Sequence, residues 1–272
     1  MFFFIGCTFF KKNKINIEGN SFSGQKIYLI DLDDKYKRTK NFNREWSKLY
    51  SNNFKPYHRL QNKVYTIIGT YEIYKESYLV IEDQKGNRFK KIIKLNQGNK
   101  FPSYVLFDSL RLQAEEIIGD TIWLNNTYDE DHFYTFSDFD FPRFEPVRVQ
   151  KLLYYQNSDN DFPLWLEVNS FFGDVAYVRY NGEEGSVGSI DHYYSTIPFP
   201  KDWGREIVQK ILNKKIELGL TERQLKISIG NPTEINITES RHGIGKQLVY
   251  KKRNGKKIYY QFEYGKLTYI ND

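Results

Sequence analysis

The pattern of apolar and polar positions in the first half of the chain predicts antiparallel β-strands. A short apolar segment lies at residues 26–32, and residues 64–74, 78–82 and 88–95 are rich in β-branched and aromatic side chains. Such side chains suit a pleated, half-buried surface. Residues 84–87, Gln-Lys-Gly-Asn, have the composition of a turn. We therefore expect the last three apolar segments to form an antiparallel meander.

A second group of strands is predicted between residues 147 and 198. Residues 163–169 alternate between an apolar and a more polar face. Residues 172–174 have a turn sequence, and residues 175–180 return as a strand. Asn181-Gly182 is a favoured pair for a two-residue hairpin and predicts a further reversal of the chain there.

The two meanders, residues 60–128 and 147–198, resemble SH3-like small β-barrels, because short strands alternate with regularly spaced turns. Aromatic residues make up 17% of the chain, with 22 Tyr and 21 Phe, and this abundance also favours a β-rich protein. The expected fold class is mainly β, with SH3-like small β-barrels followed by a C-terminal α+β module.

An acidic and aromatic segment, residues 129–146, separates the two meanders and is predicted to be a long loop. Loops of this length are either functional or disordered. Phe133, Tyr134 and Phe136 are candidate binding residues, because their rings would form an aromatic platform for a sugar or a protein. The alternative is that the rings pack over the β-core while the acidic side chains face water.

Two helices are predicted at the start of the C-terminal segment, residues 201–272. Asp202 can cap a helix that begins at Trp203, whose apolar positions fall on one face. The next helix has Thr221 as its N-cap and Gln224 at the third helical position, which is the pattern of a capping box. The sequence Gly-Asn-Pro then ends this helix.

Three strands are predicted after these helices. Asn254-Gly255 is a strong hairpin signal between residues 246–252 and 257–263. Tyr264-Gly265 turns the chain again, and residues 266–270 form the third strand. Two helices followed by a three-stranded antiparallel sheet make a two-layer α+β module.

Three motifs in this module resemble the SmpA/OmlA, or BamE-like, family. Residues 219–232 read GLTERQLKISIGNP, like the family's Gly-Met/Leu-Thr-x-x-Gln-Val/Leu, a helix and Gly-x-Pro. Residues 247–250 (QLVY) and 262–267 (FEYGKL) are similar to its later strands, with Leu248 where the family usually has Trp. The resemblance covers residues 203–272 and implies an envelope lipoprotein module that binds proteins or lipids and carries no catalytic residues.

Charge is unevenly distributed along the chain. The formal net charge is +6, and residues 201–272 hold 15 basic and 8 acidic side chains, so the remainder is nearly neutral. The candidate binding residues of the hairpin are Lys251, Lys252, Arg253, Lys256 and Lys257. They would contact anionic lipid headgroups or an acidic partner. The alternative is a hairpin kept soluble by its lysines, and nucleic acid is not an expected partner because no nucleic-acid motif accompanies the charge.

The N-terminus predicts a lipid anchor. Residues 4–7, Phe-Ile-Gly-Cys, resemble a bacterial lipobox, in which the cysteine thiol takes up diacylglycerol, and a polar segment follows as a tether. Cys7 is therefore the candidate lipidation site. A signal peptide needs a basic start and a longer apolar core, so this hypothesis expects the true start to lie upstream; an ordinary apolar N-terminus is the alternative. With one cysteine in the chain, an intrachain disulfide is excluded.

Catalytic and metal-binding patterns are not expected. None of the four histidines is spaced as a metal ligand from another His or Cys. Asp191-His192 follows two serines, but the G-x-S-x-G elbow of a serine hydrolase is missing. The strongest enzymatic alternative places a site around Asp31, Asp191 and His192. No cofactor or metal is expected.

These patterns divide the chain into an N-terminal tether (1–20), a β-rich SH3-like module (21–128), the acidic and aromatic loop (129–146), a second meander (147–200) and a BamE-like module (201–272). The predicted function is that of a non-enzymatic cell-envelope protein, periplasmic or anchored to the outer membrane. It would bind a protein or an envelope component. The alternatives are a small enzyme with a site built from distant loops, and a cytoplasmic inhibitor or immunity-type binding protein.

Overall fold

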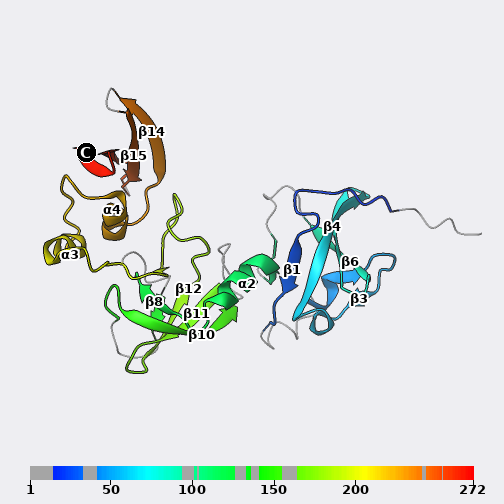
Figure 1. The fold of residues 1–272 in the computed structure, drawn as a ribbon. Helices are drawn as coiled ribbons and strands as arrows, with labels where there is room; N and C mark the ends of the chain where they lie inside the picture. Colours follow the sequence, from blue (N-terminus) through cyan, green and yellow to red (C-terminus); the bar gives the residue numbers. More distant parts are fainter. Residues whose placement is uncertain are drawn as a thin grey trace, which may run out of the picture. The chain divides into compact units, whose positions relative to one another are not determined.

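A computed structural model of the chain describes residues 15–32, 42–93, 101–102, 104–125, 133–135, 141–154, 164–240, 243–252 and 254–272. These residues form two compact units, with the boundary at Leu112 and Gln113. The fold is mainly β, as predicted, and consists of antiparallel sheets with a few helices (Figure 1).

The first unit is built on a seven-stranded antiparallel sheet. In sheet order its strands are β3 (Phe54–Lys55), β2 (Trp46–Lys48), β6 (Arg88–Ile93), β5 (Glu76–Glu82), β4 (Lys63–Ile73), β1 (Lys26–Leu29) and β7 (Val105–Phe107). Two 3-10 helices, η1 (Phe42–Arg44) and η2 (Tyr57–Arg59), lie in its connections. The predicted meander is present as β4, β5 and β6, but four further strands extend it.

The segment that precedes β1 lies against this sheet. Glu18 and Thr70 exchange backbone hydrogen bonds of 2.8 Å each. Ile15 and Ile17 pack against the buried cluster of Leu49, Tyr71 and Val80. The part of the predicted tether that the structure describes therefore packs on β4.

The second unit contains a six-stranded antiparallel sheet. In sheet order its strands are β13 (Tyr193–Tyr194), β8 (Thr121–Leu124), β10 (Pro146–Tyr154), β11 (Leu164–Asn169), β12 (Val175–Arg179) and β9 (Phe133–Thr135). The hairpin predicted at residues 163–180 is confirmed as β11 and β12. The hairpin predicted at Asn181-Gly182 is wrong, because β12 pairs with β9 and the next strand, β13, pairs with β8.

Two further elements differ from the sequence expectations. The predicted loop at residues 129–146 contains the short strand β9, so part of it belongs to the sheet. Phe141 and Phe144 of the same segment are buried, as expected if its rings pack over the β-core. Helix α2 (Asp108–Glu116) was not predicted. Ala114 of this helix is fully buried, but Leu112 is 47% exposed, so the helix has only a weak apolar face in the sequence.

The C-terminal segment folds into two helices and a four-stranded antiparallel sheet within the second unit. The helices are α3 (Arg205–Leu212) and α4 (Glu222–Ile229), and the strands are β14 (Glu234–Ser240), β15 (Gly243–Lys251), β16 (Lys257–Glu263) and β17 (Lys266–Asn271). The predicted three-stranded meander is present as β15, β16 and β17. Strand β14 adds the fourth and corrects the predicted number.

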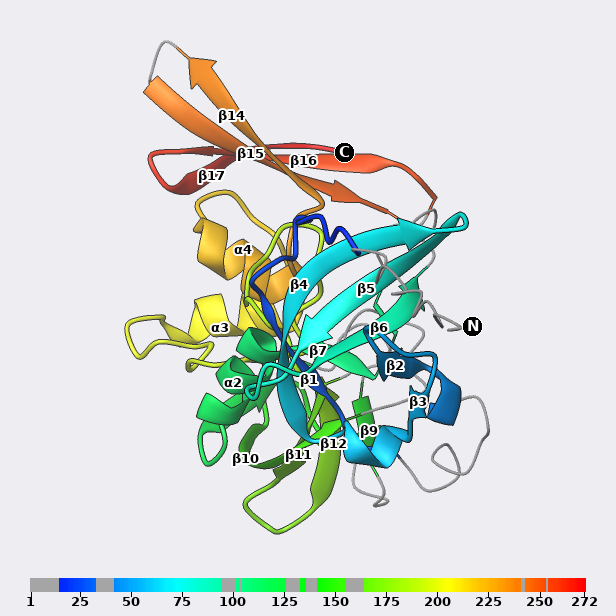
Figure 2. The ribbon, with the colours of Figure 1, turned by 90° about the vertical axis from the view of Figure 1, so that its right-hand side faces the viewer.

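Helix α4 forms where its capping sequence predicts it. The Thr221 Oγ1 accepts a hydrogen bond from the Gln224 N–H at 3.2 Å, and Gln224 Oε1 accepts one from the Thr221 N–H at 2.8 Å. Gly230 ends the helix with a φ of 90°. Leu225 packs against Leu248 of β15 in the core between helix and sheet, so α4 covers one face of the sheet (Figure 2).

Helix α3 differs from the sequence prediction in its start and in its packing. It begins at Arg205 with Gly204 as its N-cap, two residues after the predicted start. Its buried side chain, Ile211, packs with Tyr194 of β13, with Phe144 in the turn before β10 and with Ile227 of α4. The helix therefore does not cover the C-terminal sheet, and it joins that sheet's helix layer to the rest of the second unit.

Candidate functional site

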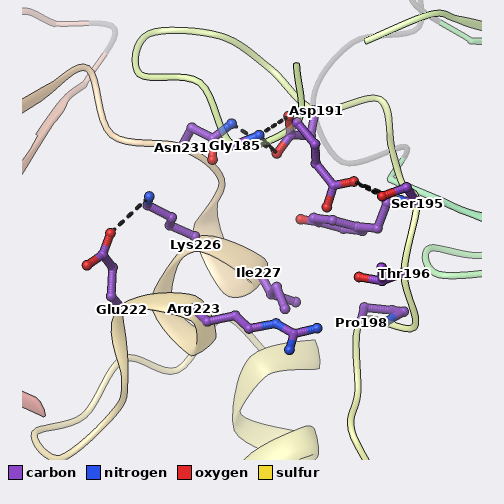
Figure 3. Close-up of a pocket in the computed structure, with 12 residues that line it drawn as sticks. Gly185, Asp191, Ser195, Thr196, Pro198, Glu222, Arg223, Lys226, Ile227 and Asn231 are labelled. Atoms are coloured by element: carbon purple, nitrogen blue, oxygen red, sulfur yellow. Dashed lines mark hydrogen bonds and ion pairs between the residues drawn. The ribbon is translucent and has the colours of Figure 1, made fainter. Parts of the chain in front are cut away.

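A cavity of about 530 Å³ lies in the second unit, between α4 and the segment that flanks β13. Its lining comprises Glu184, Gly185, Asp191, Tyr194, Ser195, Thr196, Pro198, Glu222, Arg223, Lys226, Ile227 and Asn231. Small-molecule and cofactor sites have volumes of about 300–1,000 Å³. Figure 3 shows one wall contributed by α4 and the facing wall by residues 184–198.

A buried carboxylate organises the wall formed by residues 184–198. Asp191 is 7% exposed, and its carboxylate accepts hydrogen bonds from the Gly185 N–H at 3.0 Å and from Asn231 Nδ2 at 3.0 Å. Burial raises the pKa of this carboxyl above its ordinary value, and the hydrogen bonds from Gly185 and Asn231 act in the opposite direction. Asp191 therefore connects this wall to Asn231, in the segment that follows α4.

Glu184 is the second carboxylate of the same wall. Its Oε2 accepts hydrogen bonds from the N–H and the hydroxyl of Ser195, at 2.8 and 2.7 Å. Both contacts connect the start of the segment with the residue that follows β13. Glu184 and Asp191 thus give this wall two negative charges when both are ionised.

The α4 wall carries the cationic side chains. Lys226 pairs with Glu222 at 3.0 Å, and Glu222 also pairs with Lys246 at 3.1 Å. Burial acts to raise the pKa of Glu222, but the hydrogen bonds from the two lysines outweigh it and lower the pKa. Arg223 donates to the Ile197 carbonyl at 3.1 Å and extends from α4 toward Thr196 and Pro198 (Figure 3).

Arg143 anchors the C-terminal end of α4 and so fixes the position of the cationic wall. Its guanidinium donates to the carbonyls of Ile227 and Ser228 and, at 2.9 Å, to Asn125 Oδ1. The last carbonyls of a helix lack partners within the helix and carry partial negative charge. A guanidinium at this position donates hydrogen bonds to these carbonyls and balances their partial negative charge. Sequence reasoning did not identify Arg143, because the α4 carbonyls that it contacts lie more than eighty residues away.

The residues of the predicted enzymatic alternative are divided between the two units, and the serines near Asp191 bond to the backbone. Ser186 and Ser189 direct their hydroxyls to the backbone carbonyls of Glu183 and Ser186, at 3.1 and 2.7 Å. The backbone of His192 bonds to Asn181 and Asn125. Asp31 lies in the first unit and Asp191 in the second. Among the described residues, no group of three or more His, Cys, Asp or Glu side chains is arranged to hold a metal ion.

The predicted basic hairpin lies between β15 and β16, and its lysines make ion pairs. Lys252 and Lys256 both contact the Asp272 carboxylate at 3.2 Å, and Lys257 contacts Glu234 at 2.9 Å. The hydrogen bond that Lys257 donates to the Glu234 carboxylate raises the pKa of Lys257. Lys251 is exposed at the end of β15, and Arg253 lies outside the described residues. Exposed pairs of this kind contribute little to stability, because water and salt screen the charges.

The remaining predicted site residues are less completely described. The backbones of Phe133 and Tyr134 belong to β9 and pair with Val178 and Tyr177 of β12. Phe136 and Cys7 lie outside the residues that the structure describes. The proposed aromatic platform and the proposed lipid anchor therefore stay predictions.

A second cavity, of about 330 Å³, lies in the first unit and is lined in part by Glu45, Lys90 and Lys91. Burial lowers the pKa of Lys91 to about 8. Its ammonium also lies beside the Glu45 carboxylate, which favours the charged form and acts to raise the pKa. Because the pKa is nevertheless lowered, burial is the larger effect. This cavity therefore holds a lysine that titrates near the physiological range.

Stability of the first unit is expected to rise with pH between pH 8 and about 10. In this window the unfolded chain binds the Lys91 proton, with an ordinary pKa of 10.5, while the folded chain, with a pKa of about 8, has lost it. The state that binds fewer protons gains stability as pH rises, here by about 1–3 kcal/mol. Urea unfolding across this window measures the effect. Lys91→Met should remove it, and an identical pH dependence in both proteins would contradict the assignment.

Comparison of the chain with protein-family models, curated proteins and solved structures finds no match. In the part of the chain that the structure describes, no helix has both the length and the apolar character needed to cross a bilayer.

Proposed function

We propose that the protein is a non-enzymatic binding protein whose cavity in the second unit receives a peptide segment of a partner protein. The observation that carries the proposal is the opposite net charge of the two cavity walls. Glu184 and Asp191 lie on one wall. The α4 wall carries Arg223, Lys226 and Glu222, which pairs with Lys226, so Arg223 leaves that wall net positive. A segment with one basic and one acidic side chain would complement both walls.

The apolar part of the lining supports a peptide rather than a simple ion. The buried rings and side chains of Tyr194 and Ile227, together with Pro198, contribute apolar surface between the charged walls. Ligand sites commonly combine such surface with a few polar groups that fix orientation. Binding is favoured over catalysis because the serines of the segment bond to backbone and Asp191 is engaged by two donors.

The proposed location is the cell envelope, with Cys7 as a lipid anchor and residues 201–272 as a BamE-like module. Support comes from the sequence resemblance at residues 219–232 and from the order of two helices and an antiparallel sheet. The fourth strand, β14, is a departure from the predicted module. SH3-like modules upstream also belong to this proposal, although the two sheets are larger than the meanders that suggested them.

The peptide site is tested by titrating the labelled full-length protein with the tetrapeptide Lys-Ala-Ala-Glu and following backbone amide resonances. We expect the amides of residues 184–198 and of α4 to shift. Glu184→Gln retains an acceptor for Ser195 but removes the charge, and it should weaken binding about fivefold to tenfold. Lys85→Gln, on an exposed turn of the first unit, serves as the control. Absence of shifts at millimolar peptide, or equal affinity of the Glu184 variant, would contradict the proposal.

The lipid anchor is tested separately by fractionating cells and determining the mass of the mature N-terminus. A diacylglyceryl group on Cys7 in the membrane fraction is the expected result. An unmodified Met1 in a soluble fraction would contradict the lipoprotein assignment and leave the peptide site unaffected.

A further inference from the structure

The second cavity, of about 330 Å³, is formed on one face of the seven-stranded sheet in the first unit. Ser47 of β2 pairs with Phe54 of β3 on one side and with Lys90 of β6 on the other. Ile92 lies two residues after Lys90 and pairs with Tyr78 of β5. Directly opposed residues of antiparallel strands project to the same face, with Cβ atoms about 5 Å apart, as do residues two apart in one strand. These five lining side chains therefore lie together on that face.

Two cations of this cavity have no acidic partner. The charged residues of its described lining are Arg44, Glu45, Lys90 and Lys91. The Glu45 carboxylate pairs with the Lys91 ammonium and accepts a hydrogen bond from the Tyr104 hydroxyl at 3.1 Å. Among the residues that the structure describes, neither Arg44 nor Lys90 makes an ion pair. The cavity therefore keeps two positive charges that no side chain of its lining compensates.

The ammonium of Lys90 and the hydroxyl of Ser47 are placed where a ligand in the cavity can reach them. The Lys90 Nζ lies over the Tyr78 ring, 5.5 Å from its centroid, and this cation–π contact orients the ammonium. Ser47 is only 5% exposed, and within the described parts of the chain its hydroxyl has no hydrogen-bond partner. Buried hydroxyl groups in folded proteins are normally hydrogen-bonded, and an acceptor oxygen of a ligand would bond to this one.

Apolar surface borders these polar groups. Phe54 and Ile92 line the cavity and are 50% and 51% exposed. Ligand sites commonly combine apolar surface with a few polar groups that fix orientation. A small inorganic anion would contact the cations but not these two side chains. The lining therefore fits an anion that carries an apolar organic group.

We propose that the second cavity binds a small organic phosphate monoester. Such a group carries a charge of about −1.5 to −2 near pH 7 and has three acceptor oxygens, which match Arg44, Lys90 and the Ser47 hydroxyl. A guanidinium donates to phosphate oxygens in pairs, and a lysine binds them as a point charge. A single carboxylate would leave one of the two cations uncompensated. The peptide cavity belongs to the second unit, so this inference does not depend on it.

Titration of the labelled full-length protein with phenyl phosphate at pH 7, followed through backbone amide resonances, tests the site. We expect shifts at residues 44–54 and 90–92, with a dissociation constant of about 1 mM or lower. Arg44→Gln and Lys90→Gln should each weaken binding about fivefold to tenfold. Lys48→Gln is the matched control and should bind like the parent protein, because Lys48 is an exposed lysine on the opposite face of β2.

The contribution of the organic group is tested with Phe54→Ser. This variant should weaken phenyl phosphate binding about threefold, because the ring loses an apolar contact, and leave the affinity for inorganic phosphate unchanged. Its thermal unfolding should stay close to that of the parent protein, since half of the Phe54 side chain is exposed.

Several outcomes would overturn the inference. Millimolar phenyl phosphate causes no saturable shifts, or the Arg44 and Lys90 variants bind as tightly as the parent protein. Equal affinity for benzoate would show that the cavity does not select a phosphate. Shifts confined to residues 184–198 and α4 would place the anion in the peptide cavity instead. The Lys-Ala-Ala-Glu titration reports on the second unit alone, so failure of this inference and failure of the proposed function are distinguishable.

Discussion

Replacing Arg143 with methionine is expected to destabilise the second unit by about 3 kcal/mol. The substitution leaves the carbonyls of Ile227 and Ser228 and the Asn125 side chain without their guanidinium donor. It also removes the contact between the guanidinium and the Phe144 ring, at 4.2 Å from the ring centroid. Methionine keeps much of the apolar length of the side chain, so the loss reports mainly on hydrogen bonding. Urea unfolding followed by circular dichroism measures it.

Arg143→Lys distinguishes the contribution of the positive charge from that of the guanidinium's hydrogen-bond geometry. A lysine keeps the positive charge near the C-terminus of α4 but lacks the planar, extended fork of donors that reaches all three acceptors. We expect it to recover about 1 kcal/mol of the loss. Because α4 forms one wall of the cavity, peptide affinity should fall together with stability in both variants. A change of less than about 0.5 kcal/mol for Arg143→Met would show that α4 does not depend on this anchor.

Replacing Gly69 with alanine is expected to detach the segment that precedes β1 from β4 and to destabilise the first unit by about 2–4 kcal/mol. Gly69 has a φ of 154°, and it lies where the register of β4 and β5 shifts. A Cβ there would overlap the Glu18 carbonyl and approach the Ile17 side chain to 3.1 Å. Hydrogen exchange at the Glu18 and Thr70 amides, which bond across this contact, measures the detachment.

Gly86→Ala is the matched control for this experiment. Gly86 also has a positive φ, of 77°, but a Cβ there meets no atom within 4 Å. It should therefore cost only the backbone strain of a left-handed residue, about 1–2 kcal/mol, and leave exchange at Glu18 and Thr70 unchanged. If both variants behave alike, close packing of the N-terminal segment on Gly69 is refuted.

The local elements of the fold were predictable from the sequence alone. Thr221 and Gln224 are three residues apart, and their side chains satisfy each other's backbone donors once the helix forms. The Asn254-Gly255 turn likewise connects β15 and β16 as predicted. In each case the residues that interact are neighbours in the chain, so little entropy is lost in bringing them together. The sequence therefore contained the information on which these elements depend.

Contacts between distant segments were decided by the tertiary structure. Asn181-Gly182 has the sequence of a hairpin turn, yet β13 pairs with β8, about seventy residues earlier, because Tyr193 and Tyr194 become buried there. The same applies to the cavity, where Asp191 meets Asn231 across forty residues.

The mainly β composition, the Asn254-Gly255 turn and the start and end of α4 could be predicted from local sequence alone. The strand order, the packing of α3 and the anchoring of α4 by Arg143 were decided only when the apolar faces of separate segments were buried against one another. Capping and turn formation depend on residues that are close in the chain. The hydrophobic effect, in contrast, favours any strand pairing that removes apolar surface from water. Only the complete arrangement selects among those pairings.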